Sequence, residues 1–275
     1  MAEHDSYYTD PMKKQILEFD GIELSFCSHL VLSSIYMKCE TGKIIGLMGR
    51  NGSGKSSLMK IVFGSMKSSN QSIRINGFPL IGNYQQDKFI SYLPQEGFIP
   101  QKLTIAKALD HYEINSQSLI DFFPDFNIHI QNTVRELSGG YLRLLETFLI
   151  LKSPHPFCLL DEPFSGLMPL HIEGLKQLIA EVKPTKGIIL SDHMYCHIME
   201  MADDIYLLSN GKTYLIKDRE ELVFRGYLTS RLKWRTPSFS NSSIKIKGGN
   251  TLERKYFEDR IEKNDFPEGN RQGER

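Results

Sequence analysis

This chain is constrained most by one glycine-rich run, which we call the phosphate loop: Gly49-Arg50-Asn51-Gly52-Ser53-Gly54-Lys55-Ser56-Ser57. The run fits the pattern G-x-x-x-x-G-K-[ST], in which backbone N–H groups cradle phosphates. Residues 43–48 predict a buried strand before the loop, and residues 57–63 predict a helix after it. Because glycine N–H groups and a helix N-terminus both attract an anion, this arrangement predicts a nucleotide site. A turn that binds nothing is the weaker alternative, since both flanking elements are in place.

Two kinds of residue complete a site for phosphoryl transfer. Lys55 is expected to reach the β- and γ-phosphates, and the Ser56 hydroxyl to bind Mg²⁺. An apolar run at 157–160 predicts a strand that ends on Asp161, with Glu162 next. Asp161 can then meet the Mg²⁺ held by Ser56, while Glu162 can polarise the attacking water. The alternative is an ordinary Asp-Glu-Pro turn, which is less expected in a chain that also contains the phosphate loop.

A second anion site is predicted in the signature stretch, Leu137-Ser138-Gly139-Gly140-Tyr141. Ser138 precedes a predicted helix as an N-cap does, and the paired glycines let backbone N–H groups approach an anion. One nucleotide does not need two such sites in one chain. We therefore interpret Ser138, Gly139 and Gly140 as serving the nucleotide of a second subunit, with an ordinary capped helix as the alternative.

Composition excludes several classes of protein. The 275 residues are 40% hydrophobic and 24% charged with a formal net charge of +0, so no nucleic-acid partner is expected. Four scattered cysteines without a C-x-x-C pair indicate free thiols in a reducing compartment. Residues 1–10 lack the apolar segment of a signal peptide, and no apolar run approaches the roughly 18 residues of a spanning helix. We expect a cytoplasmic protein that reaches a membrane only through another chain.

The order of the predicted elements indicates an α/β fold. Strands alternate with helices after the phosphate loop, which favours a mainly parallel central sheet covered on both faces. Before the loop, residues 16–26 predict a β-hairpin with a tight turn at Asp20-Gly21, and so an antiparallel β subdomain. Short helical segments interrupted by Pro124 predict a small helical insert at about 96–150.

The order of five features resembles the ATP-binding cassette (ABC) ATPase family: the phosphate loop, Gln95, the signature stretch, Leu159–Pro163 and His193. The resemblance covers about residues 16–224, and the serine-glycine-glycine run is close to diagnostic. It implies a P-loop NTPase of the ABC type, containing the antiparallel β subdomain and the helical insert. It also implies that two cassettes dimerise head to tail, trapping ATP between one phosphate loop and the other signature stretch.

The resemblance implies a role for each matching residue. Phe26 matches the aromatic ring that stacks on adenine, with a core-facing strand residue as the alternative. Gln95 resembles the glutamine that contacts Mg²⁺ and water beside the transporter-coupling groove, with a plain loop residue as the alternative. Asp161 resembles the Mg²⁺ carboxylate and Glu162 the catalytic base. His193 resembles the switch histidine that contacts the γ-phosphate, although a lone histidine after a strand is usually structural.

The sequence departs from the family pattern in three places. The signature stretch ends in Tyr141 where the family usually has glutamine, but Ser138 and both glycines remain, so phosphate binding is expected to persist. Met168 stands where the family usually has an aspartate, in a loop that crosses the dimer interface and bears on communication between the two sites. The insert between Gln95 and Leu137 is compact.

The chain divides into three predicted parts. Residues 1–15 form an N-terminal tail, residues 16–224 the ABC ATPase domain, and residues 225–275 a C-terminal extension. The extension is basic up to Lys247 and rich in serine, which predicts a mostly flexible appendage. As a hypothesis, its cations and Trp234 rest on anionic headgroups or a permease, and a solvated tail is the alternative.

These features predict an ATPase subunit that binds ATP and Mg²⁺ and drives a separate integral membrane permease. A second ABC ATPase subunit, identical or different, completes the dimer. One alternative is a non-transport cassette ATPase acting on ribosomes or DNA, but such relatives usually carry two fused cassettes or a long coiled coil. The other is a nucleotide-sensing module that hydrolyses poorly, and Glu162 and His193 count against it. Transported substrate and direction belong mostly to the permease.

Overall fold

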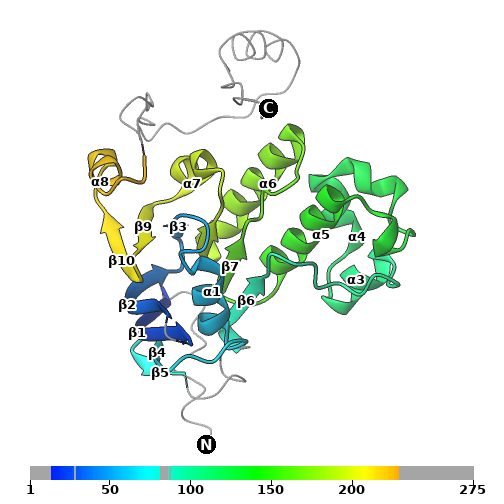
Figure 1. The fold of residues 1–275 in the computed structure, drawn as a ribbon. Helices are drawn as coiled ribbons and strands as arrows, with labels where there is room; N and C mark the ends of the chain where they lie inside the picture. Colours follow the sequence, from blue (N-terminus) through cyan, green and yellow to red (C-terminus); the bar gives the residue numbers. More distant parts are fainter. Residues whose placement is uncertain (1–13, 28, 81–85, 87, 229–275) are drawn as a thin grey trace, which may run out of the picture. The chain divides into compact units, whose positions relative to one another are not determined.

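The computed structural model describes residues 14–27, 29–80, 86 and 88–228. Within these residues, ten strands form one sheet in the order β5-β4-β1-β2-β10-β9-β3-β8-β7-β6 (Figure 1). The strands are β1 (Ile16–Phe26), β2 (His29–Glu40), β3 (Ile44–Met48), β4 (Asn70–Ile75), β5 (Phe78–Pro79), β6 (Ile90–Leu93), β7 (Phe157–Asp161), β8 (Gly187–Ser191), β9 (Asp204–Ser209) and β10 (Lys212–Ile216). The predicted N-terminal tail up to residue 13 and the extension beyond residue 228, with Trp234, lie outside the described residues.

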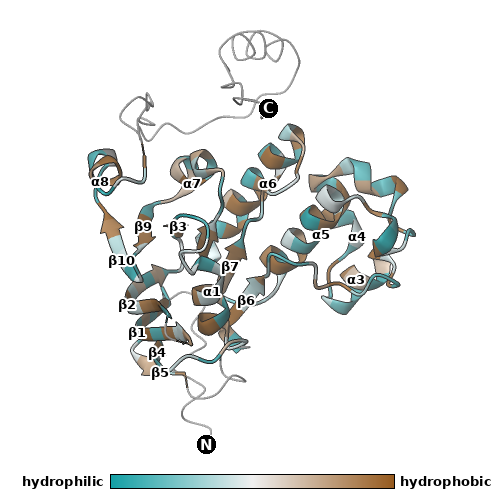
Figure 2. Cartoon of the chain, in the orientation of Figure 1, coloured by the Kyte–Doolittle hydropathy of each residue, from teal (hydrophilic) through white to brown (hydrophobic). Residues whose placement is uncertain are grey.

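The parallel half of the sheet carries the phosphate loop. β3, β8, β7 and β6 run parallel, and β3, β7 and β8 are buried along their whole lengths. Alternate strand residues enter two cores: Leu159 packs with the apolar side chains of helix α1, and Leu160 with those of helices α5 and α6. Apolar colour therefore concentrates along these strands in Figure 2. The predicted α/β fold with a mainly parallel sheet covered on both faces is confirmed.

The helices cover both faces of this sheet. The α-helices are α1 (Lys55–Phe63), α3 (Ile105–His111), α4 (Ser116–Phe122), α5 (Gly139–Lys152), α6 (Pro169–Val182), α7 (Tyr195–Met201) and α8 (Arg219–Phe224), and the 3₁₀ helices are η2 (Pro124–Ile128), η3 (Val134–Glu136) and η4 (Lys183–Thr185). Among the described residues, every helix is too short or too polar to span a lipid bilayer.

The antiparallel half is built by β1, β2, β4 and β5, but the predicted hairpin within residues 16–26 is wrong. β1 runs unbroken through that range, and Gly21 adopts a φ of 60° while the register against β2 shifts across it. A left-handed residue inside a strand makes a bulge, which bends the strand without reversing it. The chain instead reverses beyond Phe26, which pairs with His29 at the start of β2.

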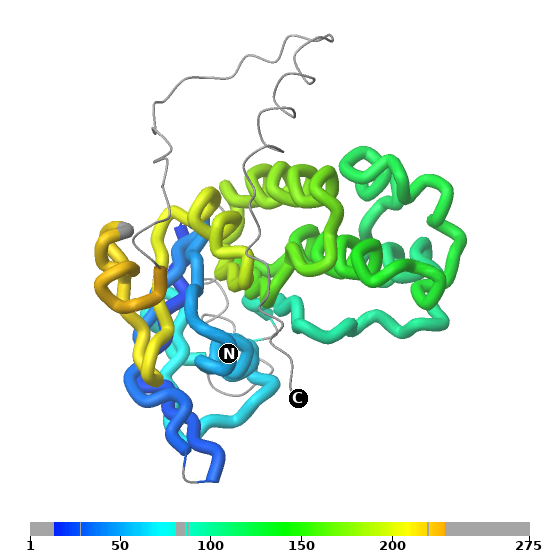
Figure 3. Tube along the Cα trace, turned by 45° about the horizontal axis from the view of Figure 1, so that its top comes forward, coloured from blue at the N-terminus to red at the C-terminus, as the bar shows by residue number. Residues whose placement is uncertain are grey.

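The segment predicted as a helical insert lies beside the sheet, in green in Figure 3. Its short helices are separated where Pro124 begins η2, and Thr104 and Asn115 cap α3 and α4 by accepting backbone N–H groups. Phe122 and Phe123 pack against Phe148 of α5, with ring centroids 6.3 Å apart in each pair. This aromatic contact joins the short helices to α5, which begins at the signature stretch.

Candidate functional site

A pocket of about 420 Å³ lies beside the phosphate loop. Its side chains come from five segments of the chain: the end of β1 with the start of β2, the phosphate loop, the loop after β6, the loop after β7 and the loop after β8. The lining residues are Phe26, Val31, Asn51, Gly52, Ser53, Gly54, Lys55, Ser56, Ser57, Gln95, Glu162 and His193. Phe26 is 54% exposed at this pocket, so the core-facing alternative does not describe it.

The side chain of Lys55 forms hydrogen bonds with the backbone of the phosphate loop. Lys55 Nζ donates to the carbonyl oxygens of Gly49 and Arg50, at 2.8 and 3.4 Å. Burial lowers the pKa of Lys55, and the neighbouring carboxylates of Asp161 and Glu162 act to raise it. Gly54, which precedes α1, has a φ of 101°, a conformation that favours glycine. The loop therefore presents a cation and the open N-terminus of α1 on the same side.

Glu162 is the centre of a hydrogen-bonded group at the pocket. Its carboxylate accepts a hydrogen bond from Gln95 Nε2 at 3.1 Å, and His193 Nδ1 lies 3.0 Å from the other carboxylate oxygen. Its backbone has a φ of 58°, which is strained for a residue with a side chain, and its N–H donates to Ser191 O at 2.7 Å. Three residues named from the sequence thus meet at one point, 67 residues apart in the case of Gln95 and Glu162.

Asp161 lies behind this group and is fully buried. Ser191 Oγ donates to its Oδ1 atom at 2.6 Å, and the Tyr92 hydroxyl lies 3.5 Å from Oδ2. Burial raises the pKa of Tyr92, so the phenol stays protonated and can donate to the carboxylate. Tyr92 and Ser191 are not predicted as site residues from the sequence. Their signal in the sequence is a hydroxyl residue near the end of each strand, three residues before Gln95 and two before His193.

The signature stretch does not line this pocket. Ser138 caps α5 by accepting the Tyr141 N–H at 3.4 Å. Gly140 approaches the backbone before α6 so closely that a Cβ atom there would lie 2.5 Å from Gly166 O, whereas a Cβ atom on Gly139 would meet nothing within 4 Å. Glycine is therefore required by packing at the second position and not at the first.

Tyr141 fastens the signature stretch to its neighbours. Its hydroxyl donates to Asp125 Oδ2 at 3.2 Å, and His171 Nε2 lies 3.4 Å from the same oxygen. The ring of Tyr141 packs edge-on against those of His171 and Phe126, with centroids 5.0 and 5.4 Å apart. Tyrosine at this departure from the family pattern thus ties the start of α5 to η2 and α6.

Met168, the other departing residue, occupies the N-cap position of α6. Its backbone has the extended conformation of a cap, but no side chain accepts a hydrogen bond from the first turn. An aspartate at this position would supply that acceptor. The side chain of Met168 is exposed.

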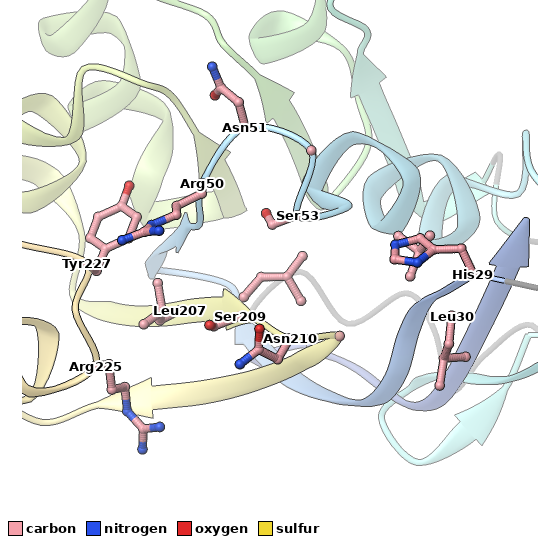
Figure 4. A pocket seen from close by; sticks show the side chains of 14 residues that line it. His29, Leu30, Arg50, Asn51, Ser53, Leu207, Ser209, Asn210, Arg225 and Tyr227 are labelled. Carbon is pink, nitrogen blue, oxygen red and sulfur yellow. The ribbon is translucent and has the colours of Figure 1, made fainter.

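A second pocket, of about 460 Å³, adjoins the phosphate loop beside the β9–β10 turn (Figure 4). Arg50 and Tyr227 stand at one end of it, and His29 and Leu30 at the other. Arg50 Nη2 donates to Gly226 O at 2.8 Å. Burial raises the pKa of Tyr227, while a hydrogen bond from the Gly49 backbone acts to lower it. The residues just after α8 therefore support the phosphate loop from behind, which the sequence did not reveal.

Comparison with known proteins gives consistent matches. A family model described as ABC transporter matches residues 32–165. The chain is 28% identical over 240 residues to the lipopolysaccharide export system ATP-binding protein LptB of Haemophilus influenzae, covering 79% of this chain and 99% of that protein. It is 26% identical to the high-affinity branched-chain amino acid transport ATP-binding protein BraG of Pseudomonas aeruginosa, covering 72% and 90%. A solved ATP binding subunit of an ABC transporter shares the fold, with a TM-score of 0.66 at 24% identity, covering 77% and 94%.

Proposed function

We propose that the chain is an ATP-binding cassette ATPase, the ATP-binding and ATP-hydrolysing subunit of a transporter that acts with a separate membrane permease. The observation that carries the proposal is the 420 Å³ pocket, where the phosphate loop faces Gln95, Glu162 and His193. This is the set that phosphoryl transfer to water requires: a phosphate cradle, a metal anchor and a group that positions the water.

In this proposal each residue of the pocket has a separate role. Lys55 and the N–H groups of the phosphate loop bind the β- and γ-phosphates. The exposed ring of Phe26 stacks on adenine. Glu162 orients and polarises the attacking water, and His193 and Gln95 hold its carboxylate from both sides.

Mg²⁺ fits the donors that are present. Ser56, Gln95 and Asp161 offer the oxygen ligands that Mg²⁺ prefers, and Asp161 is already oriented by Ser191 Oγ and Tyr92. Its charge also acts on Lys55, which places the carboxylate near the phosphate loop. When bound, Mg²⁺ supplies neutralisation of the charge on the phosphate oxygens.

A second ATPase subunit completes the site in this proposal. Ser138, Gly139 and Gly140 lie outside the pocket of their own chain, with a helix N-terminus that can receive a phosphate. Head-to-tail dimerisation would bring this N-terminus to the γ-phosphate bound by the partner. Closure and reopening would then follow ATP binding and hydrolysis, as a two-state switch.

The permease would dock at an apolar groove on the edge of the sheet. A hollow of about 380 Å³ runs along β6, the last strand of the sheet, and its lining includes Phe63, Pro94, Phe98 and Tyr112. Aromatic side chains in a concave site suit an apolar segment of a partner. Pro94 lines the groove, and the next residue, Gln95, lines the nucleotide pocket. A segment of the permease in the groove would therefore contact the residue that directly precedes Gln95. We propose that the protein reaches the membrane through this contact.

The test uses Glu162→Gln, which should bind ATP and remain in the closed dimer, with Lys55→Met as a matched variant that should not bind ATP. Cells producing each full-length variant are extracted gently in detergent with ATP, and the co-purifying proteins are identified. A polytopic membrane protein in near-equal amount, enriched with Glu162→Gln over Lys55→Met, supports the transporter role. Ribosomes, nucleic acid or the protein alone would overturn it and favour the non-transport alternatives.

A further inference from the structure

Arg143 is a buried cation that contacts the backbone on both sides of the catalytic group. It lies on α5 and is 6% exposed. Its Nη1 donates to Pro94 O at 2.6 Å, its Nε to Glu162 O at 3.1 Å, and its Nη2 to Asp161 O. One planar guanidinium thus fixes the peptides that precede Gln95 and those that carry Asp161 and Glu162.

The carbonyl groups that Arg143 binds belong to the most constrained part of the site. Glu162 has a left-handed φ of 58°, which persists only where its surroundings hold it. The backbone N–H of Glu162 donates to Ser191 O, and its backbone carbonyl oxygen accepts a hydrogen bond from Arg143 Nε. Both ends of this residue's backbone are therefore held, and its side chain is left to the pocket.

Glu146, one turn further along α5, extends this contact toward the edge of the sheet. Its Oε2 lies 3.8 Å from Arg143 Nη1, and its Oε1 accepts the N–H groups of Phe98 and Ile99 at 2.8 and 3.4 Å. Glu146 is 1% exposed, and burial raises its pKa while these N–H groups act to lower it. Phe98 lines the apolar groove on β6. A continuous chain of contacts therefore leads from this groove to the backbone of Glu162.

We propose that Arg143 is a positioning residue that sets Glu162 and Gln95 for hydrolysis, and that Glu146 passes the position of segment 94–99 to it. A partner that shifts this segment would move the Pro94 carbonyl and Glu146 together, and through Arg143 the backbone of Glu162. The part that concerns the partner rests on the proposed function. The positioning of Glu162 and Gln95 by Arg143 does not.

A matched control is available in the same fold. Lys186 is also a buried cation, 7% exposed, whose Nζ donates to the backbone carbonyl oxygens of Ser153 and His155. These residues lie outside the nucleotide pocket. Ser153 and His155 line the groove on β6. Lys186→Met therefore removes a buried cation from backbone carbonyl groups without touching the catalytic segments, and it is the control for stability in the assays made without the permease.

The experiment compares Arg143→Met, the milder Arg143→Lys, Glu146→Gln and Lys186→Met in the full chain. Hydrogen exchange should accelerate in peptides covering 94–99 and 160–164 for Arg143→Met, less for Arg143→Lys, and in neither for Lys186→Met. Steady-state ATPase assays should show kcat lowered about 10²-fold by Arg143→Met with KM for ATP nearly unchanged, because a small misplacement of a catalytic group has that effect. Glu146→Gln should retain most basal activity and lose stimulation in the complex isolated with the permease.

Several results would overturn the inference. Unchanged exchange at 94–99 and 160–164 in Arg143→Met and Arg143→Lys would do so whatever the activity. So would a loss of kcat that Lys186→Met reproduces at the same loss of stability, and full stimulation of Glu146→Gln would refute the link to the groove. If the unmodified protein does not hydrolyse ATP yet exchange responds as expected, the proposed function fails and the positioning role stands.

Discussion

The imidazole of His193 and the carboxylate of Glu162 lie 3.0 Å apart, Nδ1 to Oε1. The histidine side chain is 48% exposed and the glutamate side chain 13%, so the carboxylate is the more buried partner of the pair. They follow β8 and β7, adjacent parallel strands whose carboxyl ends meet at the same edge of the sheet. The order of strands in the sheet therefore brings His193 and Glu162 together.

Removing the imidazole should slow hydrolysis more than it weakens binding. We expect His193→Ala to lower kcat about 10²-fold, because Glu162 loses the partner that orients it toward water. ATP affinity should change little, since Lys55 and the phosphate loop carry the binding. Steady-state ATPase kinetics together with ATP titration check this, with exposed His111→Ala as the control. A variant that hydrolyses ATP at the normal rate would contradict the role of the pair.

Loss of the contact between Tyr227 and the phosphate loop should raise KM for ATP. Tyr227→Phe removes the phenol that accepts the Gly49 backbone hydrogen bond. A hydrogen bond of this kind contributes about 0.5–1.5 kcal/mol, so KM for ATP should rise roughly two- to tenfold with kcat nearly unchanged. Tyr214→Phe is the control, because Arg225 stacks on the Tyr214 ring, which this variant keeps. Equal KM values for both variants would show that the C-terminal contact does not support the loop.

Substitution of the two glycines of the signature stretch should affect the stability of the protein differently. A methyl group on Gly140 would meet Gly166 O at 2.5 Å, so Gly140→Ala should lower the free energy of unfolding by about 1–3 kcal/mol. Gly139→Ala meets nothing within 4 Å and should be tolerated by the fold. Urea unfolding measures both variants under the same conditions. Equal losses for the two substitutions would show that the approach to Gly166 is not tight.

Stability should fall in mild acid because of His197. Both ring nitrogens are buried without a hydrogen-bond partner, and the ring packs on Phe164 with centroids 5.0 Å apart. Burial lowers the pKa of His197, and the charge of Lys176 lowers it further. Below the ordinary histidine pKa of about 6.5 the unfolded chain therefore binds the proton first, and the free energy of unfolding decreases as the pH falls toward the folded pKa.

His197→Phe tests this pH dependence, because phenylalanine fills the same site without titrating. Urea unfolding at several pH values between 7.5 and 5.5 should show a smaller loss of stability for this variant than for the unmodified protein. Exposed His111→Phe is the control for replacing a histidine by phenylalanine. Parallel slopes for His197→Phe and the unmodified protein would mean that another group governs the acid sensitivity.

Local features of the fold, which depend on residues close together along the chain, can be predicted from the amino-acid sequence. The phosphate loop, the helix that follows it and the strand ending on Asp161 follow from local pattern and glycine conformation. Within the described residues, the turn predicted at Gly21 is wrong because a left-handed glycine suits a bulge as well as a hairpin.

Contacts between distant side chains follow from the three-dimensional fold and could not be predicted. Arg143 binds the Pro94 carbonyl 49 residues away, Tyr92 reaches Asp161 across 69 residues, and Tyr227 supports Gly49 from the far end of the described chain. None of these pairs leaves a periodic signal, because the order of strands in the sheet, rather than spacing along the chain, sets which strand ends adjoin. Buried polar groups then need partners, and the partners within reach are those that packing brings there.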